Sequence, residues 1–153
     1  MGAPVVLLLS GPNLQLLGER QPEIYGLDRL ADHVARASAR AGALGLVLEH
    51  VQGDSEAELV GAVHAGRRRV GAIVVNAGAL THYGWSLHDA LASFEGPVVE
   101  LHLSNPDARE PWRHRSVLSP VVNGAISGFG ALGYELAIEA AARLLAAPPA
   151  PTR

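Results

Sequence analysis

The stretch PVVLLL at residues 4–9, followed by GPNLQLLGERQPEIYG at residues 11–26, determines how the rest of the chain is interpreted. An unbroken apolar run is typical of a strand buried on both faces, as in a parallel sheet covered by helices. The helix of a short strand–helix unit normally begins within a few residues, but here the next helical pattern begins at about Leu27. A long segment after a buried first strand is usually functional, so we expect a functional loop at residues 11–26.

This loop contains three groups suited to chemistry, namely the amide of Asn13, the guanidinium of Arg20 and the phenol of Tyr25. Its glycines would allow it to hinge as a lid. A cation close to a tyrosine favours the phenolate, so Arg20 would allow Tyr25 to act as a general base. The alternative interpretation is a surface excursion whose polar residues are merely solvated.

Further apolar runs alternate with helical patterns along the chain. Strands are predicted at residues 46–48, 70–75, 97–103 and 125–127, and helices at about 27–41, 55–66 and 131–147. A helix or helical turn is expected between residues 81 and 94. Such alternation produces right-handed βαβ units and a doubly wound sheet. We therefore expect a single α/β domain at residues 1–147, with a flavodoxin-like five-stranded parallel sheet in the order 2-1-3-4-5 as the middle of three α/β/α layers. A disordered tail is expected at residues 148–153.

The composition is that of an ordinary soluble globule, with 153 residues, 48% of them apolar and 18% charged. A net charge of −3 gives no electrostatic footprint for nucleic acid. No apolar stretch is long enough to span a membrane and no signal peptide is apparent, so a cytoplasmic protein is expected. The chain has no cysteine, and all twelve basic residues are arginine. These absences exclude thiolate catalysis and a lysine Schiff base.

Polar residues gather after three of the predicted strands, at the carboxyl ends where doubly wound sheets bind ligands. They are Asn13, Asn76, His82, Glu100, His102 and Ser104. The last three alternate with apolar neighbours and therefore face the same side of their strand. Burying them is unfavourable unless they are paired or hydrated, which favours a site over a self-satisfied polar cluster. With Tyr25 as base, His102 would be the matching acid for β-elimination next to a carbonyl.

The remaining histidines show no partner spacing and are expected to be at the surface or satisfied. They are His33, His50, His64, His88 and His114. No His/carboxylate group has zinc spacing, so no metal is predicted. No GxxxxGK[ST] motif is present and no GxGxxG follows the first strand, which disfavours a flavin or nucleotide, so no cofactor is expected. A flavodoxin-like flavin- or nucleotide-binding module stays open as an alternative function.

Four stretches carry a resemblance to a known family. They are residues 11–26, VVNAGALTHYGWSLHDA at 74–90, VELHLSNPDARE at 99–110 and WRHRSVLSPVVNGAISGFGALGYELA at 112–137. In this order they resemble the type II 3-dehydroquinate dehydratases, and the resemblance extends from Val5 to about Leu145. It implies a flavodoxin-like fold and the conversion of 3-dehydroquinate to 3-dehydroshikimate in the shikimate route to aromatic amino acids, without a metal or a Schiff base.

The resemblance also implies residue roles. Tyr25 would accept the proton next to the ring ketone, and Arg20 would favour its ionisation and stabilise the transition state. Asn13 would hold a water at the developing enolate oxygen. His102 would protonate the departing hydroxyl, and Glu100 would orient His102. A catalytically silent scaffold is the remaining alternative, and it would be expected to have lost at least one of these groups.

Substrate binding and assembly are implied in the same way. The substrate's hydroxyls and carboxylate would be bound by Asn76, His82, Arg113 and the backbone at Leu103 and Ser104. Asp89 matches a residue that reaches the site of a neighbouring subunit, which implies trimers, four of which commonly form a dodecamer in the family. The sequence departs from the usual pattern at Gln15, Ala77, Tyr83-Gly84 and residues 52–57, none of which is a catalytic position.

Overall fold

A computed structural model describes residues 2–147, and the predicted tail lies outside them. The strands are β1 (Val5–Ser10), β2 (Val47–Gln52), β3 (Ala72–Asn76), β4 (Val98–His102) and β5 (Gly124–Ser127). The α-helices are α1 (Pro22–Tyr25), α2 (Leu30–Ala43), α3 (Glu56–Gly66), α4 (Trp85–Ala92) and α5 (Leu132–Ala146). Short 3₁₀ helices are η1 (Leu14–Leu16), η2 (Gly78–His82), η3 (Pro106–Ala108), η4 (Pro111–Arg113) and η5 (Ser119–Val121).

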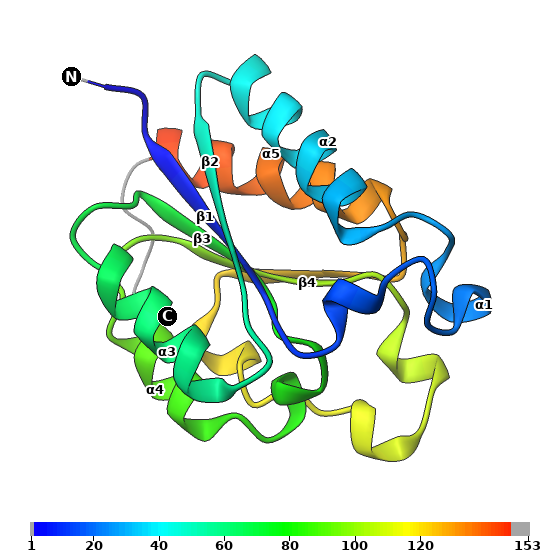
Figure 1. Ribbon diagram of the computed structural model, residues 1–153. Helices are drawn as coiled ribbons and strands as arrows, with labels where there is room; N and C mark the ends of the chain where they lie inside the picture. The colour runs from blue at the N-terminus through cyan, green and yellow to red at the C-terminus, as the bar shows by residue number, and fades with distance from the viewer. Residues whose placement is uncertain (1, 148–153) are drawn as a thin grey trace.

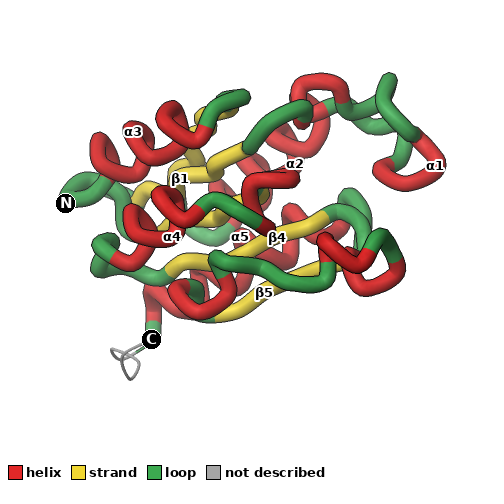
Figure 2. Tube along the Cα trace, turned by 90° about the horizontal axis from the view of Figure 1, so that it is seen from below, coloured by secondary structure: helices red, strands yellow, loops and turns green. Residues whose placement is uncertain are grey.

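The five strands form one parallel sheet in the order β2-β1-β3-β4-β5, which confirms the predicted fold class. Helices α2 and α5 cover one face of the sheet, and α3 and α4 cover the other (Figure 1). Figure 2 views the sheet from the side of α3 and α4. The order reverses direction between β1 and β3, the place where ligands bind in such sheets.

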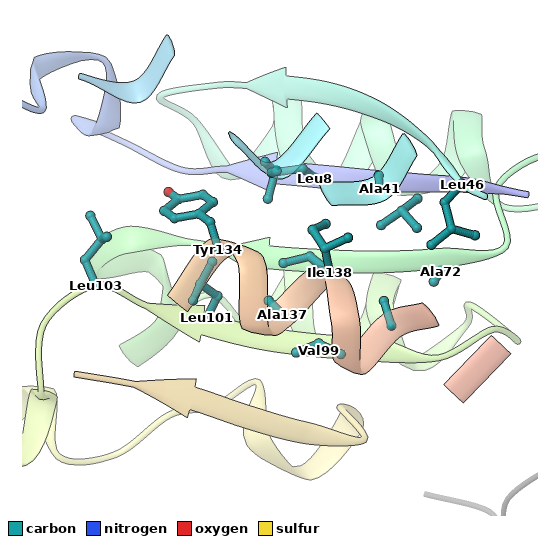
Figure 3. Packing of buried hydrophobic residues seen from close by; sticks show 14 of the residues in the cluster. Leu8, Ala41, Leu46, Ala72, Val99, Leu101, Leu103, Tyr134, Ala137 and Ile138 are labelled. Carbon is teal, nitrogen blue, oxygen red and sulfur yellow. The ribbon is translucent and has the colours of Figure 1, made fainter. Parts of the chain in front are cut away.

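The unbroken apolar run of β1 is explained by the two helix layers. Leu8 packs in the cluster below α2 and α5, whereas Leu7 and Leu9 pack against α3 and α4. All three are at most 1% exposed, and burying one such side chain contributes roughly 1.5–3 kcal/mol. Figure 3 shows the cluster that contains Leu8, in which Tyr134 lies at the same end as Leu103.

Several element boundaries differ from the sequence prediction by a few residues. Helix α2 begins at Leu30, where the backbone N–H of Arg29 donates to the Asp32 carboxylate at 2.9 Å. Strand β2 continues to Gln52, beyond the predicted 46–48. The prediction stopped early because the later residues of the strand are polar or partly exposed and form no apolar run. The helix or helical turn expected between Thr81 and Phe94 is α4, which lies within that range. A separate 3₁₀ helix, η2, precedes it, and the Gly84 N–H bonds back to the Leu80 carbonyl at 2.7 Å.

Candidate active site

A cavity lies at the carboxyl ends of β1, β3 and β4, between the loop at residues 11–26 and the segment that follows β4. Its polar lining is formed by Asn13, Arg20, Tyr25, Asn76, His82, His102, Ser104, Arg109 and Arg113, and Leu103 lies beside them. The structure thus brings together most of the residues that the sequence analysis selected. Two are placed elsewhere: Glu100 lies behind His102, and Asp89 lies exposed on α4 and does not line the cavity.

The loop reaches the cavity through an unusual backbone. Asn13 (φ 69°) and Gln21 (φ 43°) are the non-glycine residues with positive φ between residues 2 and 147, and both belong to this loop. Gly18 (φ 89°) lies so close to the Leu27 carbonyl oxygen that a Cβ would approach it to 2.9 Å. Positive φ is costly for an L-residue and persists where surrounding structure enforces it, commonly at functional sites.

Tyr25 lies between two guanidinium groups. Its hydroxyl accepts a hydrogen bond from Nη1 of Arg109 at 2.7 Å, and the same nitrogen donates to Oγ of Ser104 at 3.3 Å. Cζ of Arg109 lies 5.1 Å from the centre of the tyrosine ring, and Cζ of Arg20 lies 5.4 Å from it. Two guanidinium groups, one from the loop and one from the segment after β4, thus flank Tyr25.

Arg109 is the site residue that the sequence analysis missed, since only Arg20 was assigned to Tyr25. It lies within the quoted stretch at 99–110, directly after η3 and seven positions beyond His102, where β4 ends. The sequence did contain a signal for Arg109: it is a cation that follows a strand ending in a carboxylate–histidine pair. Its contact with Tyr25 spans 84 positions of sequence, which no local pattern reveals.

His102 and Glu100 form a tightly hydrogen-bonded pair. Nε2 of His102 lies 2.6 Å from Oε2 of Glu100, which is 2% exposed. Oε1 of Glu100 accepts from the hydroxyls of Ser116 at 2.9 Å and Ser119 at 3.3 Å. Burial raises the pKa of Glu100, but the contacts with His102 and the two serines outweigh it and hold that pKa below its ordinary value. Glu100 is therefore an ionised carboxylate that fixes the ring and leaves Nδ1 of His102 for a ligand.

Asn76 and His82 form a polar part of the cavity lining, and hydrogen bonds to neighbouring residues fix both side chains. Nδ2 of the buried Asn76 donates to the hydroxyl of Tyr134 at 3.2 Å, and its Oδ1 accepts from the Gly78 N–H at 3.4 Å. Burial raises the pKa of Tyr134 to about 12, so this phenol stays neutral. Nδ1 of His82 donates to the Arg115 carbonyl at 2.8 Å, and burial lowers the pKa of His82. A neutral His82 then presents Nε2 as an acceptor for a ligand hydroxyl.

The histidines outside the cavity fall into two groups. His50, His88 and His114 each have a hydrogen-bond partner, and His64 is exposed, as expected. The prediction was wrong for His33, which is 1% exposed, stacks on Tyr134 with ring centres 4.7 Å apart, and has no hydrogen-bond partner at either ring nitrogen. Burial lowers the pKa of His33, so the ring is a neutral part of the core.

Among residues 2–147, no three His, Cys, Asp or Glu side chains are grouped so that they could hold a metal ion. No helix in the part of the chain that the structure describes has the length and apolar character needed to cross a membrane.

Comparison with known proteins places this geometry in a family. Residues 4–142 match the model of the family "Dehydroquinase class II". A 3-dehydroquinate dehydratase from Shewanella sp. (strain MR-4) is 50% identical over 142 residues, covering 93% of this chain and 97% of the relative. One from Hyphomonas neptunium is 51% identical over 139 residues, covering 91% and 93%.

Solved structures agree. The crystal structure of type II dehydroquinase from Propionibacterium acnes superimposes with a TM-score of 0.88 at 41% identity, covering 93% of this chain and 98% of that one. A 3-dehydroquinate dehydratase-like protein from Bifidobacterium longum superimposes with a TM-score of 0.72 at 32% identity, covering 94% and 99%. Sequence, fold and cavity therefore lead to one conclusion: the chain belongs to the class II dehydroquinase family.

Proposed function

We propose that this chain is a type II 3-dehydroquinate dehydratase that converts 3-dehydroquinate to 3-dehydroshikimate in the shikimate pathway, with Tyr25 as base and His102 as acid. Family membership supports the reaction. The observation that supports the residue roles is the contact between the Tyr25 hydroxyl and Arg109 at 2.7 Å, in the same cavity as the His102–Glu100 pair.

The first step is removal of the proton next to the ring ketone by the Tyr25 phenolate. A unit charge about 4 Å away contributes on the order of 4 kcal/mol at an effective dielectric near 20, before desolvation is subtracted. Two guanidinium groups lie near Tyr25, so charge on its oxygen would be stabilised from two sides during proton removal. Arg109 takes the direct role because it donates to the hydroxyl, and Arg20 adds charge over the ring.

The second step is loss of the hydroxyl as water. Asn13 holds a water at the enolate oxygen, where hydrogen-bond donors stabilise the developing charge. His102 donates its proton to the departing hydroxyl through Nδ1, and the Glu100 carboxylate stabilises the imidazolium that precedes this transfer. The substrate loses one proton to Tyr25 and gains one from His102, so the chain returns to its starting state once a proton passes from Tyr25 back to His102.

The substrate's hydroxyls and carboxylate are assigned to Asn76, His82, Arg113 and the backbone at Leu103 and Ser104, all of which belong to the cavity lining. Asp89 is assigned to the site of a neighbouring copy. Assembly into trimers and dodecamers, a cytoplasmic location and a single domain at residues 1–147 stay predictions.

The test is an ultraviolet assay with 3-dehydroquinate, repeated after borohydride is added with substrate. The product is a conjugated enone carboxylate, so absorbance rises as water leaves. A rise that persists after borohydride supports a dehydratase that forms no imine. Absence of any rise from a folded preparation contradicts the proposal and favours a silent scaffold or a binding module.

A further inference from the structure

Asp54 joins two loops at the carboxyl end of the sheet. It lies directly after β2, yet its Oδ1 accepts a hydrogen bond from the backbone N–H of Asn13 at 3.1 Å. Nε2 of Gln15 donates to both carboxylate oxygens, at 3.0 and 2.8 Å, and Nε2 of Gln52 donates to Oδ1 at 3.2 Å. The Asn13 N–H, followed by the Gln15 amide, holds the pKa of Asp54 below its ordinary value, so the group is a carboxylate.

An ionised carboxylate only accepts hydrogen bonds, and this sets the direction of the network. Gln15 and Gln52 must both turn their NH₂ groups toward Asp54. Oε1 of Gln15 then accepts from Nε2 of Gln52 at 3.0 Å, and Nε2 of Gln52 also lies 3.2 Å from the Gly11 carbonyl oxygen. The network therefore ends on two backbone groups of the catalytic loop, the carbonyl of Gly11 and the N–H of Asn13.

The backbone held in this way is left-handed. Asn13 has φ 69° and ψ −1°, a conformation that asparagine tolerates better than most L-residues but that still costs free energy relative to the right-handed region. Its carbonyl accepts from the Leu16 N–H at 3.0 Å, and its N–H donates to Asp54, so the peptide groups on both sides of its Cα are fixed. Because Asn13 lines the cavity, this backbone sets where its amide side chain points.

We infer that Asp54 is a positioning residue of the active site, which acts through the backbone of Asn13 to aim the Asn13 amide at the substrate. The inference rests on the proposed function for what Asn13 does. Asp54 is exposed and lies outside the cavity. The inference nevertheless gives it an effect on turnover.

The test compares Asp54→Ala and Asp54→Asn with Glu49→Ala. Glu49 is an exposed carboxylate of β2 that pairs with Arg69 and takes no part in the Asp54 network. Glu49→Ala therefore removes a comparable surface charge without touching Asn13. Asp54→Ala is expected to lower kcat about tenfold with a smaller change in KM, since misplacing a reacting group is costly. Asp54→Asn is expected to fall between, because it keeps one acceptor oxygen but turns an NH₂ toward Gln15. Glu49→Ala is expected to leave both constants unchanged.

A double variant separates positioning from a general loss of structure. If Asp54 acts through Asn13, adding Asp54→Ala to Asn13→Ala costs little further kcat. If the fold-losses in kcat of the two single variants multiply in the double variant, the two residues act independently and the inference is overturned. An unchanged kcat in Asp54→Ala also overturns it.

Amide hydrogen exchange gives a readout without substrate. The Asn13 N–H is expected to exchange slowly in the wild-type chain and at least tenfold faster in Asp54→Ala, with the amides of β3 unchanged. Equal exchange of Asn13 in both chains overturns the inference. If the wild-type chain shows no turnover of 3-dehydroquinate, the proposed function fails, and this exchange comparison alone decides whether Asp54 holds the loop.

Discussion

The loop after β1 and the segment after β4 form opposite walls of the cavity and are built in different ways. The loop contains the left-handed Asn13 and Gln21, and its position depends on turns and on Asp54. The segment after β4 is fixed by side-chain hydrogen bonds, among them those of Ser116 and Ser119 to Glu100. The loop supplies Tyr25, the proposed base, and the segment after β4 supplies Arg109, which donates a hydrogen bond to the Tyr25 hydroxyl. The contact between Tyr25 and Arg109 therefore joins the two walls.

Removal of the phenol should have the largest effect. Tyr25→Phe deletes the proton acceptor but keeps the ring between the two arginines, so kcat should fall by about a thousandfold while substrate still binds. Initial rates and calorimetric binding measure the two quantities. Tyr83→Phe, at an exposed tyrosine outside the cavity, is the control and should behave as wild type. Normal turnover by Tyr25→Phe would show that Tyr25 is not the base.

Removal of the cation on the opposite wall should come next. Arg109→Ala takes away the donor to the Tyr25 hydroxyl, and kcat should fall roughly a hundredfold. Arg109→Lys should recover part of this loss, because it keeps the charge but not the fork that reaches both Tyr25 and Ser104. Arg143→Ala, on the exposed side of α5, serves as the control in the same assay. Unchanged kcat in Arg109→Ala would leave Arg20 alone as the activating group.

Glu100→Gln should reduce kcat about tenfold, because the ring of His102 loses its ionised partner. It should also alter acid stability. The folded pKa of Glu100 lies below its ordinary value of 4.5, so Glu100 stabilises the folded chain above that value, and this contribution disappears as the pH falls through the lower folded pKa. Denaturant unfolding between pH 6 and pH 3 should show a shallower acid loss in Glu100→Gln than in the control Glu139→Gln. Equal slopes would remove Glu100 from the account of acid stability.

The smallest effect is expected where the loop backbone alone is changed. Gly18→Ala places a Cβ close to the Leu27 carbonyl and forces an L-residue to positive φ, which should cost about 1–2 kcal/mol of unfolding free energy. Turnover should fall only a few-fold, since no reacting group is lost. Gly61→Ala, in α3 with open space at its Cβ, should be neutral or slightly stabilising by urea unfolding. No destabilisation by Gly18→Ala would mean that the loop backbone is not strained there.

The sheet could be predicted from the sequence because its central strands, β1, β3 and β4, are largely apolar and buried. Leu7, Leu8 and Leu9 are consecutive and all buried, a pattern that only a strand covered on both faces produces. The alternation of helices and strands predicted a doubly wound parallel sheet, and the order 2-1-3-4-5 was the simplest choice for five strands. Element boundaries were less predictable, because the polar β2 lies at an edge of the sheet and leaves only a short apolar run.

The site was predictable where its residues follow strands and unpredictable where they meet across the fold. Glu100 and His102 are two positions apart, so their alternation placed them on one side of β4. Tyr25 and Arg109 meet only through tertiary structure. His33 was misjudged because a polar ring was not expected on the buried face of α2, which includes Leu30, His33, Ala37 and Ala41. The His33 ring stacks on Tyr134, and this contact allows an imidazole to lie in the core. Helical spacing alone does not reveal such a contact.

The most direct test of the central claim follows the substrate proton itself. Proton NMR of 3-dehydroquinate in D₂O, with Tyr25→Phe and His102→Ala in parallel, reports exchange at the carbon next to the ketone separately from water loss. His102→Ala should lose most dehydration but still exchange this proton, and Tyr25→Phe should do neither. Exchange catalysed at the wild-type rate by Tyr25→Phe would contradict the assignment of Tyr25 as the base that Arg109 activates.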